Sequence, residues 1–481
     1  MPGPFTLTLT EEQHTVLFAY LFPGDDDEHG AVIAASVVIT ERGTRLIARD
    51  VFLAEDGIDY VPGQRGYRML TASFVSEKIR YCRNQKLAYL AVHNHGGDRS
   101  VRFSSYDLAS HERGYPALSK ISRGQIVGGL VFSKRAVAGD LWLPDGTRVE
   151  LESARLLGPS VRTIYPMPHV VACDARFDRQ ARLFGDEGQR QLSAMKVGVI
   201  GAGGAGSLLV EYLARLGVGH LVVADFDRVD LTNVPRITGT TYGDARAFLT
   251  NERRPRWICQ LGKRLAVRKI DVMRRIARRA NPLVTFEGIF GDVCDDPVAR
   301  RFIDCDYIFL AADSFSARLV FNAIVHQYLI PGVQVGAKVP VDKTSGDVGE
   351  VVVVVRPVRP GENCLWCAEL IPAAKLTEEA TSSEQRAAQR YVDDTIVHAP
   401  SVITLNAVAA SAAADGFLFT MLGLTRNNAT REYVSYRSRR RTWKIDVPRR
   451  DDDCPWCSPR GALGRGDAEG LPTRPPQKRK K

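Results

Sequence analysis

The chain has 481 residues, a formal net charge of +10 and a hydrophobic content of 44%, so it is long enough for two or three globular domains. No stretch approaches the roughly 20 apolar residues that a membrane helix needs, and the N-terminus lacks the basic and apolar regions of a secretion signal. We therefore expect a cytoplasmic protein without a membrane segment. Four of the nine cysteines lie in two CxxC pairs, which favours metal binding over a disulfide framework.

Residues 1–155 are predicted to form a first α/β domain. Runs rich in β-branched and small apolar residues indicate four strands, at 31–38, 45–52, 87–92 and 126–132. The third strand carries a metal-binding pattern at its C-terminal end, His93-Asn94-His95. Histidines at this spacing lie on the same side of the chain.

Asp107 follows the second histidine by twelve residues and is predicted to lie on the next helix, where it can complete a three-ligand site. Three protein ligands leave a fourth position for water, which is typical of catalytic zinc. Zinc lowers the pKa of such a water to about 7 and makes hydroxide available at neutral pH. The pattern therefore predicts a metal-dependent hydrolase.

With Ser104 included, the pattern resembles the JAMM signature of the JAB/MPN metalloproteases. The resemblance implies that His93, His95 and Asp107 bind zinc and that Ser104 stabilises the tetrahedral intermediate. It also implies an upstream glutamate as general base. The alternative is a degenerate scaffold of this family that binds no metal.

Glu28 precedes a strand of small residues and is the general base that we expect, with Glu41 and Glu55 as alternatives. Gly96 stands where the family usually has proline. That departure changes a loop and removes no ligand.

Residues 156–175 are predicted to connect two domains, because three prolines disfavour a helix there. A second α/β domain is expected at 176–458. Its predicted strands and helices alternate, which indicates a parallel sheet. We expect strands at 196–200, 221–224, 307–311 and 351–355, and helices at 207–216, 270–280 and 401–419.

A glycine-rich turn joins the first strand and helix of this domain, and its glycines are Gly201, Gly203, Gly204 and Gly206. Such a turn lets backbone N–H groups approach a phosphate at a helix N-terminus. The turn alone also fits NAD, with Asp225 on the ribose, so a redox enzyme is the alternative at this point.

The residues around the turn resemble the ThiF/MoeB-type activating enzymes, over about residues 176–457. The matching motifs are Arg176–Gln180, Leu183–Gly185, the glycine turn, Asp225–Asp227, Asn281-Pro282, Asp313 and both CxxC pairs. The resemblance implies a Rossmann-like fold that uses ATP to adenylate the C-terminal glycine of a ubiquitin-like or sulfur-carrier protein.

The same resemblance assigns roles to individual residues. Asp225 is expected to bind the ribose, and Asp313 to organise Mg²⁺. Phosphate contacts are expected from Asn233, Arg236 and Lys269, with Lys263 as a rival to Lys269, because 253–256 form a basic insertion before it. Arg179 is expected to act across a homodimer as an arginine finger.

Cys364, Cys367, Cys454 and Cys457 are predicted to bind a structural zinc, since four thiolates leave no open position. A redox role is the alternative. Relatives that form a thioester with their substrate commonly carry the nucleophile between the two pairs, and this chain has no cysteine there. Cys259 is a weak candidate, and Cys173, Cys294 and Cys305 remain.

Residues 459–481 are rich in Gly, Pro and basic residues and are predicted to be a disordered tail. Nucleic acid is not expected as a partner, because no recognition motif accompanies the charge. The whole pattern predicts an enzyme that processes and adenylates a ubiquitin-like protein, with a conjugating enzyme as a further partner and antiviral defence as a setting suggested by similar fusions. The alternatives are sulfur-carrier activation for cofactor or amino-acid biosynthesis and a nonenzymatic scaffold.

Overall fold

The computed structural model describes residues 3–25, 27–62, 68–168, 174–251, 253–342, 345–380, 400–425 and 432–474. The chain divides into two compact units. The first unit comprises Met1–Val170, His326–Leu329 and Pro459–Gly470. The second unit comprises Val171–Val325, Ile330–Ser458 and Leu471–Lys481.

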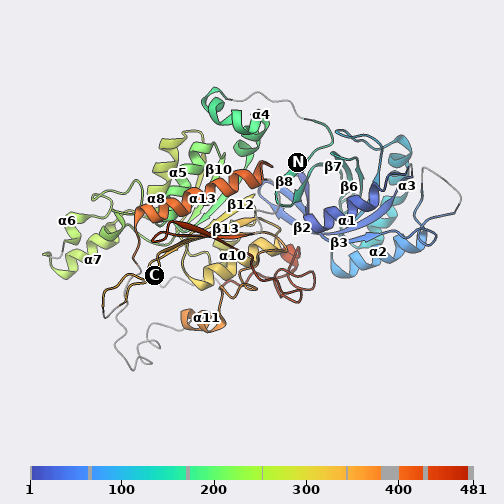
Figure 1. The fold of residues 1–481 in the computed structure, drawn as a ribbon. Helices are drawn as coiled ribbons and strands as arrows, with labels where there is room; N and C mark the ends of the chain where they lie inside the picture. The colour runs from blue at the N-terminus through green and yellow to red at the C-terminus, as the bar shows by residue number, and fades with distance from the viewer. Residues whose placement is uncertain are drawn as a thin grey trace. The chain divides into compact units, whose positions relative to one another are not determined.

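The first unit is built on one mixed sheet, and the predicted strands are confirmed as β2, β3, β4 and β5 (Figure 1). The strands run in the order β1-β3-β2-β4-β5-β6-β7-β8, and β1 also pairs with β7, which closes the sheet on itself. The strands are β1 (Phe5–Thr10), β2 (Gly30–Thr40), β3 (Gly43–Leu53), β4 (Ala88–Asn94), β5 (Val127–Phe132), β6 (Val137–Trp142), β7 (Arg148–Leu157) and β8 (Val161–Ile164). The helices are α1 (Glu11–Leu21), α2 (Ala72–Gln85) and α3 (Ser105–Ser122).

Apolar side chains from alternate positions of these strands fill the core of the first unit. Leu7, Ile33, Leu90 and Leu130 belong to one buried cluster, and Leu17 of α1 packs into it. A second buried cluster on α2 and α3 includes Phe74 and Tyr115. The alternation of strand side chains therefore places one cluster on each side of the sheet.

The predicted connection at 156–175 is partly wrong. Residues 156–164 contain the end of β7 and all of β8, and these two strands pair antiparallel. The prolines that suggested a connection lie outside the paired positions, at 159, 166 and 168. Residues 169–173, including Cys173, lie outside the described residues.

The predicted disordered tail also differs from the structure, because residues 459–470 belong to the first unit. Ser36 Oγ donates a hydrogen bond to the carbonyl of Gly464 at 2.8 Å. The guanidinium of Arg49 donates to the carbonyls of Pro459 and of Leu463, the latter at 2.7 Å. Side chains of β2 and β3 thus satisfy backbone groups of a segment that has no apolar periodicity of its own.

Hydrogen bonds also fix the chain near the end of this segment, at Asp467 and at Arg474. Tyr328 Oη donates to Asp467 Oδ1 at 2.8 Å within the first unit. Beyond it, the backbone N–H of Arg474 donates to the carbonyl of Cys294 at 2.7 Å within the second unit. Residues 475–481, the most basic part of the predicted tail, lie outside the described residues.

The second unit also carries one long sheet, in the order β11-β10-β9-β12-β13-β14-β15-β16. The strands are β9 (Lys196–Ile200), β10 (His220–Ala224), β11 (Thr285–Ile289), β12 (Tyr307–Leu310), β13 (Gly332–Lys338), β14 (Val352–Val358), β15 (Tyr433–Arg437) and β16 (Thr442–Asp446). Strands β9 to β13 are parallel, and β14 to β16 extend the sheet in antiparallel fashion. The parallel core of the prediction is confirmed.

Helices cover this sheet, with α5, α8 and α13 packed together on one face and α10 on the other (Figure 1). The helices are α4 (Asp178–Ala194), α5 (Gly204–Leu216), α6 (Ala247–Thr250), α7 (Arg256–Leu265), α8 (Lys269–Ala280), α9 (Asp296–Ala299), α10 (Phe315–Gln327), α11 (Ala373–Ala380) and α13 (Ile403–Met421). By length and composition alone, α13 could cross a membrane. It packs against α5, β13 and β14, and Phe417 is fully buried, as in a core helix.

The contacts of residues 459–470 predict how an Arg49→Ala variant behaves. Loss of two charge-assisted hydrogen bonds, which contribute roughly 1.5–3 kcal/mol each, frees this segment from β3. We expect trypsin to cleave after Arg460 and Arg465 at least about tenfold faster than in the wild-type chain, as measured by mass spectrometry. Arg83→Ala, on the surface of α2, is the matched control, and equal cleavage of both variants would contradict the contact.

Candidate functional site

The register of β2 and β4 assembles a candidate metal centre in the first unit. His93 lies opposite Gly30 in this antiparallel pair, so the residues before β2 reach the end of β4. His93 Nε2 and His95 Nε2 lie 3.2 Å apart. Asp107 approaches both rings, with one oxygen 3.7 Å from His93 Nε2 and the other 3.4 Å from His95 Nε2.

Ser104 fixes Asp107 at the N-terminus of α3. The Ser104 hydroxyl donates to Asp107 Oδ2 at 2.7 Å, and the two residues form a capping box. Burial alone would raise the pKa of Asp107, but its contacts with His93 and Ser104 outweigh burial and hold the pKa well below the usual range. Asp107 is therefore a buried carboxylate that remains charged.

Glu28 is the glutamate that the structure brings to this centre, with Oε1 3.5 Å from His95 Nε2. Burial raises the pKa of Glu28, and the nearby His93 and His95 oppose that shift. The carbonyl of Arg102 lies 3.1 Å from His95 Nδ1, which leaves Nε2 as the nitrogen that faces the other ligands. The arrangement thus offers two imidazoles and one carboxylate as ligands, with a second carboxylate beside them.

These donors fit zinc by their spacing. Ligand bonds of roughly 2.0–2.2 Å in a tetrahedral site place nitrogen and oxygen donors about 3.3–3.6 Å apart. The separation of the two nitrogens, 3.2 Å, and the distances from each nitrogen to its nearer Asp107 oxygen, 3.7 and 3.4 Å, bracket that range, with a different carboxylate oxygen facing each histidine. His93, His95 and Asp107 therefore have the spacing of zinc ligands. They form one of two potential metal-binding groups among the described residues.

The second group is formed by Cys364, Cys367, Cys454 and Cys457 in the second unit. Cys364 Sγ lies 3.9 Å from Cys454 Sγ, and Cys367 Sγ lies 3.6 Å from Cys457 Sγ. A tetrahedral zinc with sulfur bonds of about 2.3 Å requires roughly 3.8 Å between thiolates, whereas a disulfide requires about 2.05 Å. All four cysteines are buried, so the spacing fits a closed structural site and disfavours redox pairing.

The glycine turn lies where the strand order of the second unit reverses. The chain runs from β9 outward to β10 and β11 and then returns to β12 on the other side of β9. Ligands of open parallel sheets bind at such a switch point, beyond the carboxyl ends of the strands. Gly201 follows β9, Asp225 follows β10 and Asp313 follows β12, so the structure brings these three predicted residues to one edge.

Steric demands explain the glycines of the turn. Gly201 has a φ of +97°, and a Cβ there would lie 2.9–3.0 Å from the backbone of Ala311 and Ala312. A Cβ on Gly206 would lie 1.9 Å from the carbonyl oxygen of Gly201. A Cβ on Gly204 would lie 2.0 Å from Asn406. A Cβ on Gly203, by contrast, would have no neighbour within 4 Å, and Gly203 is half-buried, so this position of the turn faces open space.

Asp225 ties the turn to its surroundings. Its Oδ2 accepts a hydrogen bond from the N–H of Ala202 at 2.7 Å, and its Oδ1 accepts one from the N–H of Asp227 at 2.8 Å. Burial raises the pKa of Asp225, and the charge of Lys269 opposes that shift. Lys269 Nζ binds Asp227 at 2.7 Å, whereas Lys263 is exposed on α7. Lys269 is therefore the lysine that lies beside this site.

The other predicted residues of the nucleotide site differ in their burial and in their contacts. Asn233 is buried, and its Oδ1 accepts from the N–H of Asp230 at 3.1 Å. The backbone of Arg236 packs near Gly204. Asp313 and Arg179 are exposed, and Arg179 stands on α4 with no ion pair to the part of the chain that the structure describes.

Sequence reasoning missed a buried polar group beside the metal centre. His111 lies one turn after Asp107 on α3, and its Nδ1 is 2.8 Å from Asp140 Oδ2. Arg148 completes the group by donating to both oxygens of Asp140. The i, i+4 spacing of Asp107 and His111 is the signal that could have indicated a shared helix face.

Comparison with known proteins identifies the second unit. The ThiF family matches residues 177–456 of the chain. The molybdopterin-synthase adenylyltransferase of Salmonella typhimurium is 28% identical over 194 residues, 40% of this chain and 66% of that protein. The ThiS sulfur-carrier adenylyltransferase of Bacillus subtilis is 30% identical over 150 residues, 31% of this chain and 39% of that protein.

A third relative is the ubiquitin-like modifier-activating enzyme 5 of Xenopus laevis, which is 24% identical over 212 residues, 41% of this chain and 46% of that protein. The chain therefore spans between 39% and 66% of the lengths of these three relatives. The predicted resemblance to ThiF/MoeB proteins is confirmed. The family match does not include residues 1–176, so the predicted JAB/MPN metalloprotease domain stays a prediction.

The steric environment of the turn predicts opposite outcomes for two neighbouring substitutions. Gly206→Ala drives a methyl group into a carbonyl oxygen, and overpacking of this kind costs roughly 1–3 kcal/mol. We expect a melting temperature lower by several degrees. Gly203→Ala meets open space at a φ of −81° and should melt within about a degree of the wild-type chain. Equal melting of the two variants in differential scanning calorimetry would contradict this geometry.

Proposed function

The chain belongs to the ThiF family, and we propose that its second unit uses ATP and Mg²⁺ to adenylate the C-terminal carboxylate of a small carrier protein. The observation that carries this proposal is the open turn around Gly203 at the strand switch point, with Asp225 beside it. The named adenylyltransferase relatives support the same chemistry.

In the proposed reaction, a carboxylate oxygen attacks the α-phosphorus of ATP, and the bond to the bridging oxygen breaks as pyrophosphate leaves. The turn presents backbone N–H groups to phosphate, and Asp225 receives the ribose hydroxyls. Arg236 and Lys269 offset the charge that develops on the triphosphate, and the Asn233 amide donates a hydrogen bond to it. Asp313 provides the carboxylate that holds Mg²⁺. We further propose a homodimer in which Arg179 reaches the partner's site.

A sulfur-carrier protein is the substrate that the comparisons favour. One relative is named for activation of the sulfur carrier ThiS. The sequence also has no cysteine between Cys367 and Cys454, where thioester-forming relatives commonly carry one. Cys259 is half-buried, with Sγ 3.4 Å from the carbonyl of Asn251, and stays a weak candidate for a thioester.

Activation of a ubiquitin-like modifier is the second candidate function, supported by the similarity to the Xenopus enzyme. A conjugating enzyme would then accept the activated carrier. The two candidates differ in product: sulfur transfer ends in a thiocarboxylate, and modification ends in an amide bond to a target.

We also propose that the first unit is a zinc-dependent peptidase, on the strength of the 3.2–3.7 Å separations among His93, His95 and Asp107. Zinc held there would supply a hydroxide at neutral pH. Glu28 would take the proton from the attacking water, and Ser104 would hold Asp107 in place and face the reacting carbonyl. The four-cysteine group would hold a second zinc with a structural role only.

Pyrophosphate release tests the adenylation proposal. The chain mixed with ATP, Mg²⁺ and a panel of purified sulfur-carrier and ubiquitin-like proteins should release pyrophosphate with at least one of them. Asp313→Ala and Asp225→Ala should lower the rate by at least about a hundredfold, because charge stabilisation in a closed site contributes several kcal/mol. Mass spectrometry of the carrier should show an acyl-adenylate.

Asp415→Ala, an exposed carboxylate on α13, is the matched control and should keep the wild-type rate. Absence of release with every carrier, or equal rates for Asp313→Ala and Asp415→Ala, would refute the proposal.

Zinc content separates the two metal sites. Elemental analysis should find about two zinc ions in the wild-type chain and one in both His93→Ala and Cys364→Ser. Cys364→Ser should also melt at a lower temperature, since structural zinc contributes folding free energy. Glu28→Gln should retain both ions but lose cleavage of a carrier precursor extended past its terminal glycine. Full zinc content in His93→Ala, or full cleavage by Glu28→Gln, would remove the peptidase proposal.

A further inference from the structure

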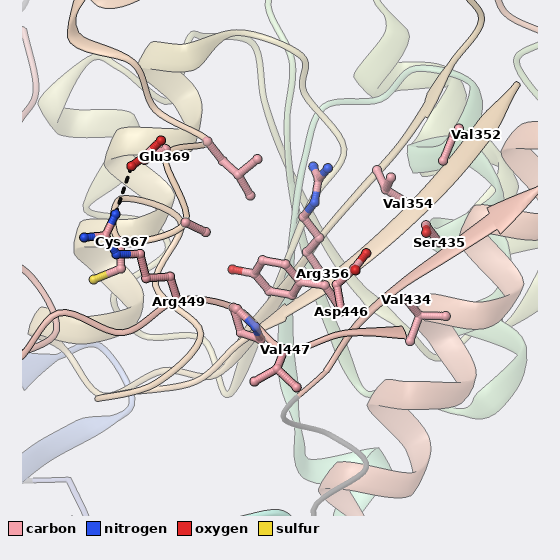
Figure 2. A pocket seen from close by; sticks show the side chains of 14 residues that line it. Val352, Val354, Arg356, Cys367, Glu369, Val434, Ser435, Asp446, Val447 and Arg449 are labelled. Carbon is pink, nitrogen blue, oxygen red and sulfur yellow. Dashed lines mark hydrogen bonds and ion pairs between the residues drawn. The ribbon is translucent and has the colours of Figure 1, made fainter. Parts of the chain in front are cut away.

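A pocket of about 560 Å³ lies in the second unit beside the four-cysteine cluster (Figure 2). Valines from β14, β15 and the segment after β16 line it together with Leu370. The valines are Val352, Val354, Val434 and Val447. Arg356 lies in the middle of the pocket, between the valines and the pair formed by Glu369 and Arg449, as Figure 2 shows.

The charged groups that line the pocket are paired, with one exception. Glu369 binds Arg449 at 3.1 Å, and Asp446 forms an ion pair with Lys444. Arg356 Nη1 donates only to a neutral group, Gln334 Oε1, at 2.8 Å. Among the residues that the structure describes, no carboxylate forms an ion pair with Arg356.

Arg356 is half-buried, and a guanidinium without an ion pair in such a place is costly, since partial removal from water favours a counter-charge. Burial lowers the pKa of Arg356 and the charge of Arg318 lowers it further, whereas Tyr433 and Asp446, which also line the pocket, oppose that shift. The two buried lysines of this unit among the described residues have carboxylate partners: Lys196 binds Asp304 at 3.1 Å, and Lys269 binds Asp227 at 2.7 Å. The exception therefore indicates a site whose counter-charge comes from a ligand.

The sheet connects this pocket with the nucleotide site. Ile200 lies opposite Leu310, Leu310 opposite Gln334, and Gln334 opposite Arg356. These four residues form one row across β9, β12, β13 and β14, and Ile200 immediately precedes the glycine turn. Three strand spacings of about 4.8 Å separate the ends of the row, which an extended peptide covers with roughly four or five residues.

Arg318 also connects the pocket with the nucleotide site. It belongs to the first turn of α10, five residues after Asp313, and its Nη1 donates to the carbonyl of Leu370 in the pocket wall at 3.3 Å. Its Nε is buried without a hydrogen-bond partner among the described residues. Arg356 in the pocket and Arg318 against its wall thus supply two guanidinium groups, and their positive charge favours an anionic peptide.

We propose that this pocket binds an acidic side chain of the carrier protein, located roughly four or five residues before its C-terminus. Arg356 receives the carboxylate, and aliphatic neighbours in the extended tail pack against the valines. The proposal rests on the proposed adenylation function, because the bound peptide is the C-terminal tail of the carrier protein that would be adenylated. It makes Arg356 a residue that selects among carriers.

The test uses synthetic peptides and the full chain. Ten-residue peptides end in Gly-Gly with an amidated C-terminus, and each carries one glutamate at positions three to eight from the end in an alanine, serine and valine background. Matched peptides carry glutamine instead. Fluorescence anisotropy without ATP measures binding. We expect the glutamate peptide to bind at least about tenfold more tightly than its glutamine partner, with the largest ratio near positions four to six.

Two variants locate the effect. Arg356→Gln should remove the preference for glutamate, while Arg279→Gln, which removes the same charge from an exposed position on α8 outside the pocket lining, should keep it. Arg356→Glu should prefer lysine-bearing peptides, which separates recognition from loss of fold. Unchanged zinc content and melting temperature of Arg356→Gln control for folding.

Equal binding of acidic and neutral peptides in every register, or no binding of either, would overturn the proposal. A preference that appears only when a free C-terminal carboxylate replaces the amide would also overturn it, because the pocket would then bind the terminal carboxylate and not the glutamate side chain. Peptide selection without pyrophosphate release from any carrier would instead indicate failure of the adenylation function. Release without peptide selection would leave adenylation intact and remove the role of Arg356.

Discussion

The hydrogen bond from the N–H of Ala202 to the carboxylate of Asp225 is the contact on which the candidate nucleotide site depends. It joins the glycine turn after β9 to the end of β10. The same carboxylate accepts the N–H of Asp227, and Asp227 holds Lys269 at the start of α8. One half-buried carboxylate therefore aligns three segments that are distant in sequence. Burial raises the pKa of Asp225, and the charge of Lys269 and the two backbone hydrogen bonds oppose that shift.

In the first unit, helix capping and strand register likewise bring the residues of the site together. The capping box between Ser104 and Asp107 begins α3 and at the same time points the aspartate at the two histidines. The β2–β4 register brings Glu28 to the end of β4. Asp107 both caps the start of α3 and completes the site, so the position of its carboxylate is restricted by the helix. This restriction agrees with the spacing of 3.2–3.7 Å among the ligand atoms.

Local signals explain what the sequence could predict. Short apolar strands, the glycine turn, His93 with His95, and both CxxC pairs are each contained within a few residues, and the structure brings each group together. The tail at 459–470 could not be predicted, because its carbonyls are satisfied by Ser36 and Arg49, more than 400 positions away. Arg356 was missed for a similar reason: its surroundings arise from the pairing of β14 with β13 and β15 and from a pocket wall that includes the segment after β16.

The two proposed activities are chemically consecutive although their evidence is independent. Hydrolysis of a peptide bond places a water oxygen on the acyl carbon and releases the amine, so its product is a free carboxylate. Adenylation consumes a free carboxylate and cannot use an amide, whose nitrogen is a poor leaving group and whose oxygen carries no charge to attack phosphorus. A precursor with residues beyond its terminal glycine would therefore be inert to the second unit until the first had acted. The family match bears on the second unit alone, and the metal centre stands on the donor spacing of His93, His95 and Asp107. The order of reaction that links them, cleavage first and activation second, follows from the substrates and requires no contact between the two sites.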